Sequence, residues 1–179
     1  MAAIVYDIDP THSSAHFSVR HLMISNVKGE FTKVTGTVTF DPADPKASKV
    51  EAHIDVASLH TRDEQRDGHL KSADFFDAAN FPEIKFASKS VEPDGHDEYL
   101  VKGDMTIHGV TKEVALHVEG PTPEVKDPWG NLKAGAAATG KINRKDFGLT
   151  WNAALETGGV MIGEEVKINL EVELTRRPA

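Results

Sequence analysis

Apolar and polar residues alternate with a period of two through nearly the whole chain. The clearest run lies near the C-terminus, where polar or charged residues separate the apolar side chains of Val166, Ile168, Leu170, Val172 and Leu174. Such alternation is typical of a β-strand with one buried and one solvated face. We count eight runs of this kind, without helical crossovers between them. The pattern therefore predicts an all-β, antiparallel meander.

Eight antiparallel strands are about enough to close a small barrel around its own interior. A sandwich of two sheets is the competing architecture. We favour the barrel, because the long and regular last strand would be hazardous as an open apolar edge. A barrel that spans an outer membrane is not expected, because the sequence lacks the aromatic girdles of that class.

Residues 62–79 are the exception to the alternation. They are rich in helix-forming residues, and Thr61 or Asp63 is suited to cap the start of a helix. Pro82 prevents the helix from continuing. The sequence thus predicts one helical segment, with a single apolar stripe formed by Leu70, Ala73 and Phe76.

Turn-forming residues separate the expected strands. Phe147, Leu149 and Trp151 also alternate, and we expect them to continue a strand into the last of the turns. The turn signals are Pro93-Asp94-Gly95, His108-Gly109, Pro128-Trp129-Gly130-Asn131 and Gly158-Gly159.

The composition limits the classes of function. At 179 residues the chain is expected to form a single domain over residues 1–179. Its formal net charge of −8 argues against a nucleic-acid partner. The sequence has no cysteine, which excludes disulfides, thiolate metal sites and cysteine nucleophiles.

The sequence also bears on the compartment. No apolar run reaches the roughly 18 residues that a membrane-spanning helix needs. The first residues lack the basic region and the apolar stretch of a signal peptide. We expect the chain as written to be cytoplasmic, and to be periplasmic or secreted if a leader was removed.

No group of residues has the spacing of a catalytic or metal site. The nine histidines form no zinc-like cluster, and there is no Gly-x-Ser-x-Gly element. We therefore expect no catalytic residue, no metal and no cofactor. A dense charge cluster is interpreted as ion pairs on an exposed helix face, and it consists of Arg62, Asp63, Glu64, Arg66 and Asp67.

The interior of the barrel is then the place to look for function. Small residues on inward faces leave space, and an apolar space suits an apolar ligand. The alternative is a barrel packed solid by its own side chains, whose surface serves as an interaction module. The small residues that we expect to face inward are Ala52, Gly103, Gly135 and Ala137.

Short motifs follow one another along essentially the whole chain. They are Asp9-x-x-His12-Ser13, Phe17-x-x-x-His21, Gly29-x-Phe31, Ser58-Leu59-x-Thr61, Arg66-Asp67-x-His69-Leu70, Asp74-Phe75-Phe76, Phe81-Pro82-x-Ile84-x-Phe86, Gly103-Asp104-Met105-Thr106-Ile107-His108-Gly109-Val110-Thr111 and Asn143-Arg144-x-Asp146-Phe147-Gly148. Together they resemble the YceI-like, polyisoprenoid-binding family. The resemblance implies a lipocalin-like antiparallel barrel with a helix packed at one side. It also implies an elongated apolar tunnel for a long isoprenoid or similar lipid, often in a homodimer.

We therefore predict non-catalytic binding, storage or transport of a long-chain isoprenoid lipid, such as a polyprenyl compound or a quinone, by a homodimer. Arg66 and His69 are expected to contact its head group if the helix lines the mouth of the tunnel. An enzyme that acts on such a lipid through Arg66, Asp67 and His69 is the alternative. The expected apolar lining is Phe17, Val38, Phe40, Val56, Leu59, Phe75, Phe76, Phe86, Met105, Ile107, Leu116, Leu149 and Trp151.

Overall fold

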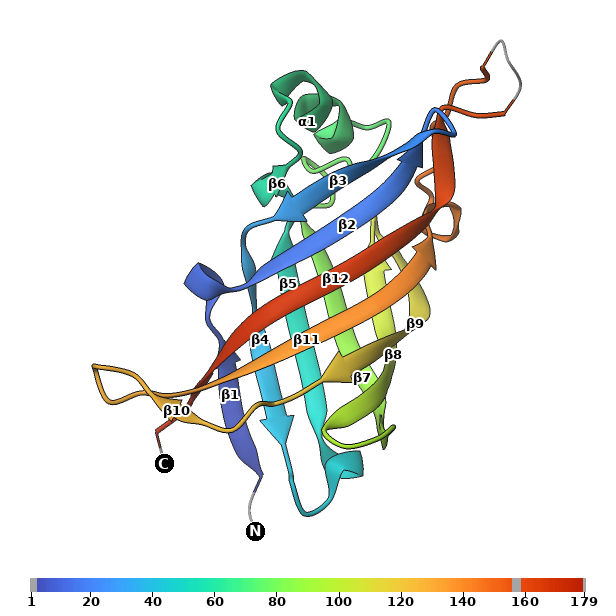
Figure 1. The fold of residues 1–179 in the computed structure, drawn as a ribbon. Coiled ribbons are helices and arrows are strands. Elements are labelled where there is room, and N and C mark those ends of the chain that lie inside the picture. Colours follow the sequence, from blue (N-terminus) through green and yellow to red (C-terminus); the bar gives the residue numbers. More distant parts are fainter. Residues whose placement is uncertain (1–2, 156–158, 179) are drawn as a thin grey trace.

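The computed structural model describes residues 3–155 and 159–178, and its strands close into a barrel (Figure 1). The ring closes because β12 pairs with β11 on one edge and with β1 on the other. Every pairing in it is antiparallel, so the predicted eight-stranded antiparallel barrel is confirmed. In chain order the ring strands are β1 (Ile4–Ile8), β4 (Val34–Phe40), β5 (Lys49–Asp55), β7 (Glu83–Pro93), β8 (Glu98–Ile107), β9 (Val110–Glu119), β11 (Leu132–Asn143) and β12 (Ile162–Arg176).

The remaining strands extend this ring. The first half of β12 pairs with β2 (Ser14–His21), whereas its end pairs with β1. Thus β1 and β2 form one edge, interrupted by the short helix η1 (Pro10–His12). The sheet continues from β2 to β3 (Ser25–Phe31) and β6 (Leu59–His60), and β10 (Val125–Lys126) pairs with β11. Two further short helices are η2 (Pro45–Ala47) and η3 (Val56–Ser58).

The helix α1 (Glu64–Lys71) is shorter than the predicted segment 62–79. Asp63 caps it as expected, because its carboxylate accepts a hydrogen bond from the backbone N–H of Arg66 at 3.0 Å. Ser72 ends it by donating to the carbonyl of His69 from both its hydroxyl and its backbone N–H. The predicted stripe is therefore wrong: of its three residues only Leu70 lies in the helix, and Ala73 and Phe76 lie in the turns that follow.

The helix lies at one end of the barrel, and both chain ends lie at the other end (Figure 1). It contacts β6, which pairs with β3. Among the residues that the structure describes, no helix is both long enough and apolar enough to cross a membrane.

Three of the four predicted turns stand where their sequence signals place them. Ile107 pairs with Val110 across the His108-Gly109 turn, where both residues have positive φ, as such a two-residue turn requires. The strand expected through Phe147 is wrong, because a short helix, η4 (Arg144–Phe147), stands there. Asn143 caps η4 and Gly148 ends it in the left-handed conformation. Gly158 of the last predicted turn lies outside the described residues.

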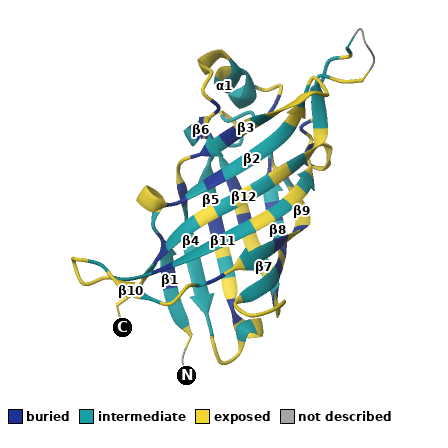
Figure 2. Ribbon diagram, viewed as in Figure 1, coloured by how far each residue is buried: buried dark blue, intermediate teal, exposed yellow. Residues whose placement is uncertain are grey.

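The alternation along β12 separates a core face from a solvated face, as the change of colour along this strand shows (Figure 2). The expected inward direction of Gly135 and Ala137 is wrong. These residues pair with the outward-facing Glu173 and Glu171, and directly paired residues share a face of the sheet. The inward small residues of β11 are their neighbours, Ala134, Ala136 and Ala138, which pair with Leu174, Val172 and Leu170.

Candidate ligand-binding site

Two cavities lie inside the barrel. The helix-side cavity has a volume of about 190 Å³ and is bounded by β2, β3, β12, α1 and the turns after α1. The base cavity has a volume of about 120 Å³ and lies nearer the chain ends, against β4, β5, β8, β9 and β11. On this scale a void of about 10–15 Å³ already holds a water molecule, so each cavity is far larger than a packing defect.

Four side chains line both cavities: Ile54, Ile84, Met105 and Leu170. They come from β5, β7, β8 and β12, and we call them the waist. The two cavities therefore adjoin each other along the barrel, and the four side chains between them are all apolar. A flexible methionine at such a point can change rotamer to admit a chain.

The walls of this space are apolar because the strands present their inward faces to it. In the base cavity the lining consists almost wholly of aliphatic and aromatic side chains. Two inward-facing alanines of β11, Ala136 and Ala138, leave room where larger residues would fill the interior. Gly103 does not create space in the same way. A β-carbon there would lie 2.4 Å from the carbonyl oxygen of Ala87 and 2.7 Å from the ring of Phe86.

The structure brings most of the predicted lining residues together. Met105 stands at the waist, and Arg66 and His69 line the helix-side cavity. Val56 and Leu59 are buried in the core and line neither cavity. The helix-side cavity contains Phe17, Phe75, Phe76, Ile107, Leu149 and Trp151, and the base cavity contains Val38, Phe40, Phe86 and Leu116.

Aromatic rings gather at the helix end of the site. The ring centroid of His69 lies 4.8 Å from that of Trp151 and 5.1 Å from that of Phe75. Asp74 orients the imidazole, because its carboxylate lies 2.8 Å from Nε2 of His69. The sequence reasoning missed Phe31, whose ring packs against Phe17 and Phe76. The alternation of Val27, Gly29 and Phe31 was the signal that could have found it.

The charge cluster around α1 is not the ion-pair network that the sequence suggested. Within the described part of the chain, no ion pair joins its members. The Asp67 carboxylate instead accepts hydrogen bonds from the backbone N–H and the hydroxyl of Thr61. Arg66 donates to the same residue, from Nε to Oγ1 at 2.9 Å and from Nη2 to the carbonyl at 2.6 Å. The interpretation failed because Thr61 competes for both charged side chains.

Arg144 is a lining residue to which the sequence reasoning assigned no role. It is 4% exposed, and its guanidinium donates to the carbonyls of Leu149, Trp151, Ile162 and Gly163 at 2.6 to 3.3 Å. Burial lowers the pKa of this guanidinium. Its four hydrogen bonds hold the segment that carries Leu149 and Trp151 against the start of β12. Its only sequence signal was its place in the Asn143-Arg144 motif.

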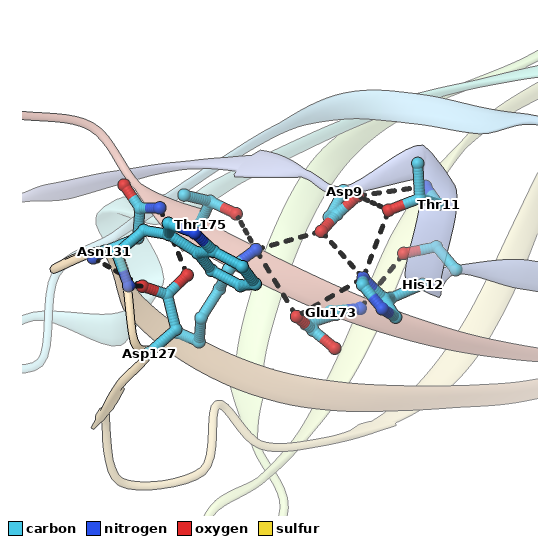
Figure 3. Close-up of polar contacts among 10 residues, drawn as sticks. Asp9, Thr11, His12, Asp127, Asn131, Glu173 and Thr175 are labelled. Carbon is cyan, nitrogen blue, oxygen red and sulfur yellow. Dashed lines mark hydrogen bonds and ion pairs between the residues drawn. The ribbon is translucent and has the colours of Figure 1, made fainter.

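A second group of titratable side chains lies outside the barrel, where η1 interrupts the edge (Figure 3). Oδ2 of Asp9 lies 3.0 Å from Nδ1 of His12 and 2.9 Å from Nζ of Lys133. Asp9, His12 and Glu173 could together offer ligands to a metal ion. However, the Lys133 ammonium already lies between the two carboxylates, 3.3 Å from Glu173, and offsets part of their charge. The group therefore ties η1 to β11 and β12.

The Asp9 carboxyl has a strongly shifted pKa. Burial alone would raise it, but hydrogen bonds from His12, Lys133 and Thr11 outweigh burial and hold the pKa well below its usual range. The hydrogen bond between Asp9 and His12 raises the pKa of His12. The Asp9 carboxyl is therefore ionised, and its contacts with His12 and Lys133 lie on the outer surface of the barrel.

The chain is similar in sequence to a known family of proteins. A model of the YceI-like domain family matches residues 6–174. The UPF0312 protein of Staphylococcus aureus (strain MSSA476) is 41% identical over 170 residues, which cover 95% of this chain and 96% of that protein.

Two solved structures have the same fold. Burkholderia cenocepacia BcnA is 24% identical with a TM-score of 0.78, over 93% of this chain and 98% of that chain. A polyisoprenoid binding domain from Saccharophagus degradans, implicated in plant cell wall breakdown, is 16% identical with a TM-score of 0.65. That match covers 96% of this chain and 98% of that chain.

Proposed function

This chain belongs to the YceI-like domain family, and we propose that its interior binds one long-chain isoprenoid lipid, or a similar amphiphile such as a quinone, without transforming it. The observation that carries the proposal is that two apolar cavities adjoin each other inside the barrel and share the four apolar side chains of the waist. An elongated apolar space suits a slender chain better than a compact ligand. The name of the Saccharophagus degradans domain, which has the same fold, supports the same ligand class.

The energetics favour a long ligand. Each buried methylene contributes about 0.8 kcal/mol, so one isoprene unit contributes roughly 3 kcal/mol before losses. Immobilising a flexible chain costs several kcal/mol, which a few units offset. Affinity then depends on chain length and needs few hydrogen bonds, in agreement with the nearly all-apolar base cavity.

Two alternatives are less well supported. A solid barrel would leave no cavities of this size in its interior. An enzyme that uses Arg66, Asp67 and His69 would need these groups to act on one substrate atom. Instead, Asp67 is engaged by Thr61, and the Nε2 atom of His69 is engaged by Asp74. Carriage or storage requires only that the protein shelter the lipid from water and release it.

Mass spectrometry tests the proposal directly. Protein purified under native conditions is expected to show an adduct of one lipid per chain, and an organic extract should release a long-chain isoprenoid. Protein that carries no lipid and takes up none after reconstitution with prenyl compounds would contradict the proposal.

A substitution at the waist makes the test specific. Met105→Trp places a bulky ring between the two cavities, and we expect it to abolish uptake of a long chain. Lys102→Trp is the matched control, because Lys102 is an exposed residue of the same strand. Circular dichroism and urea unfolding should show that both variants fold. Unchanged uptake by a folded Met105→Trp variant would place the lipid elsewhere.

The homodimer and the cytoplasmic location stay predictions. The molar mass from light scattering tests the first, and fractionation of the source cells tests the second.

A further inference from the structure

Exposed apolar side chains gather at one end of the barrel. Of the six large apolar side chains that are exposed among the described residues, four lie there, and Ile24 is 75% exposed and Met23 51%. The turn between β2 and β3 lies at the end that carries α1 (Figure 1). Single exposed apolar residues are ordinary, but a group of four indicates an interaction surface. We call this group the apolar tip, and it consists of Leu22, Met23 and Ile24 in that turn and Val160 shortly before β12.

The apolar tip is one contiguous surface, although its residues come from two distant segments. The backbone N–H of Leu22 donates to the carbonyl of Met161 at 2.7 Å. A β-carbon added at Gly159 would lie 3.3 Å from Cγ of Met23, so the methionine side chain lies directly over this glycine. Val160, between the two contacts, is thereby held beside the turn.

The turn is built from residues that its backbone does not favour. Leu22 and Met23 have φ values of 52° and 64°. Two successive residues with positive φ are usually asparagine, aspartate or glycine, because a larger side chain crowds the backbone. Of the six described non-glycine residues with positive φ, these two are the only apolar ones. Asparagine and glycine would suit the hairpin better, so the apolar side chains serve something other than its stability.

A lipid bilayer suits such a tip better than a protein partner does. A stable protein interface uses about 20–30 residues on each side, whereas the tip offers four apolar side chains on a projecting turn. Binding to the boundary between head groups and acyl chains needs no complementary surface, because its strength scales with the apolar area that enters the lipid.

The charge at the base of the tip agrees with this choice. Arg20 is exposed and holds the turn, donating from Nη2 to the carbonyl of Met23 at 3.1 Å. This contact leaves further N–H donors of Arg20 for a phosphate oxygen of a phospholipid. The two carboxylates at the start of β12 are paired with lysines, Glu164 with Lys145 and Glu165 with Lys141.

We propose that the apolar tip inserts into the surface of a phospholipid bilayer, with Arg20 at the level of the lipid phosphates. Residues next to the tip, His21, Met161 and Ile162, line the helix-side cavity, so this docking sets that end of the barrel against the membrane. The proposal goes beyond the proposed lipid-binding function and stands without it, because it rests on the outer surface alone.

A single fluorescent label tests which end meets the bilayer. The chain has no cysteine, so Ile24→Cys creates one site for an environment-sensitive dye. Val125→Cys is the matched control, because Val125 is 67% exposed on β10, at the other end of the barrel (Figure 1). Phosphatidylcholine vesicles are used, since a net charge of −8 repels an anionic surface. The emission of the label at position 24 should shift to shorter wavelength, and that of the label at position 125 should not.

Substitutions separate membrane docking from a structural role. The double variant Leu22→Asn with Met23→Gly gives the turn its preferred residues, so urea unfolding should show equal or higher stability. Its binding to the vesicles, measured by cosedimentation, should fall at least about tenfold. Ile24→Ser, at an exposed position, should lower binding about threefold or more, whereas Val125→Ser should keep it.

The outcomes also separate this proposal from the lipid-binding function. A label at position 24 that ignores vesicles, or a folded double variant that binds them like the parent, would overturn the docking. Light scattering that shows a dimer dissolved by the tip variants would do the same, because the tip would then be covered by a second copy. Uptake of a prenyl lipid from detergent is measured in parallel. Uptake without vesicle binding rejects only the docking, and vesicle binding without uptake rejects only the lipid-binding function.

Discussion

Two glycines illustrate how one residue type has opposite roles in this barrel. Gly103 lies on the inward face of β8 and is packed so closely that an added β-carbon would lie 2.4 Å from a backbone oxygen. Gly68 lies inside α1, with no atom within 4 Å of such a β-carbon. Close approach therefore requires glycine at position 103, whereas at position 68 glycine only weakens the helix.

Alanine at each position should change stability in opposite directions. Gly68→Ala should raise the free energy of unfolding by up to about 1 kcal/mol, because alanine favours the helix. Gly103→Ala should lower it by roughly 1–3 kcal/mol, because the backbone of β7 must shift. Urea unfolding of the two variants beside the parent measures both effects. Equal effects of the same sign would refute this account of the two sites.

Tyr6 is a buried ionisable residue on β1. Burial, then the hydrogen bond that its hydroxyl donates to Glu124 at 2.9 Å, raises its pKa to about 12. Its ordinary pKa is about 10, so between these values the unfolded chain loses the proton first. The free energy of unfolding therefore falls as pH rises through this window, by about 1.4 kcal/mol per pH unit for this residue.

Tyr6→Phe should remove that part of the alkaline loss. At pH 8 the variant should be less stable by about 1 kcal/mol, because the hydrogen bond to Glu124 is gone. The gap should close and then reverse between pH 10 and 12, because the loss of about 1.4 kcal/mol per pH unit in the parent exceeds the difference at pH 8. Thermal unfolding of both proteins measures it. A gap that stays constant over this range would show that Tyr6 titrates normally.

At the scale of elements, Arg144 joins η4 and the following segment to the start of β12. Four carbonyls share one guanidinium, so truncation leaves buried acceptors without partners. Arg144→Met should lower the free energy of unfolding by roughly 3 kcal/mol or more, and Arg144→Lys should not restore it because lysine lacks the planar fork.

Lys145→Met is the matched control for this prediction. Its side chain forms an exposed ion pair with Glu164, and such pairs contribute at most about 1 kcal/mol. Urea unfolding compares the three variants. If Arg144→Met were as mild as Lys145→Met, the guanidinium would not be the tie that the hydrogen bonds indicate.

The sequence predicted an element correctly where one face is polar and the other is apolar. The last strand was predicted correctly, because Lys167, Asn169 and Glu171 define its solvated side. The run from Gly135 to Ala138 has no polar residue to define a side, so its inward face was assigned wrongly. The segment after Arg144 alternates like a strand, but the Asn143 cap and Gly148 fold it into η4.

The candidate site was predictable to a similar degree. Inward positions on regular strands were found, such as Met105 and Leu116, because alternation fixes their direction. Contacts between distant segments were not found. Thr61 engages both Asp67 and Arg66, and Arg144 binds carbonyls up to 19 residues away. No periodic pattern encodes such contacts.

At the scale of the whole molecule, closure of the barrel creates the interior and the lengths of the inward side chains shape it. The alanines of β11 face leucine and valine of β12 and leave the base cavity open. Arginines and histidines line the helix-side cavity beside its apolar side chains, whereas the lining of the base cavity is almost wholly apolar. The interior therefore has two apolar cavities, of which the one at the helix end also has basic groups in its wall.

The dependence of affinity on chain length tests this claim most directly. In a Trp129→Phe variant, Trp151 is the one remaining tryptophan and lines the helix-side cavity. Prenyl compounds with the same head group and increasing numbers of isoprene units are titrated by its emission. We predict one ligand per chain and an affinity that rises about tenfold per unit until the space is full, then levels off. An affinity independent of length, or no binding at any length, would contradict an internal apolar path that holds a lipid.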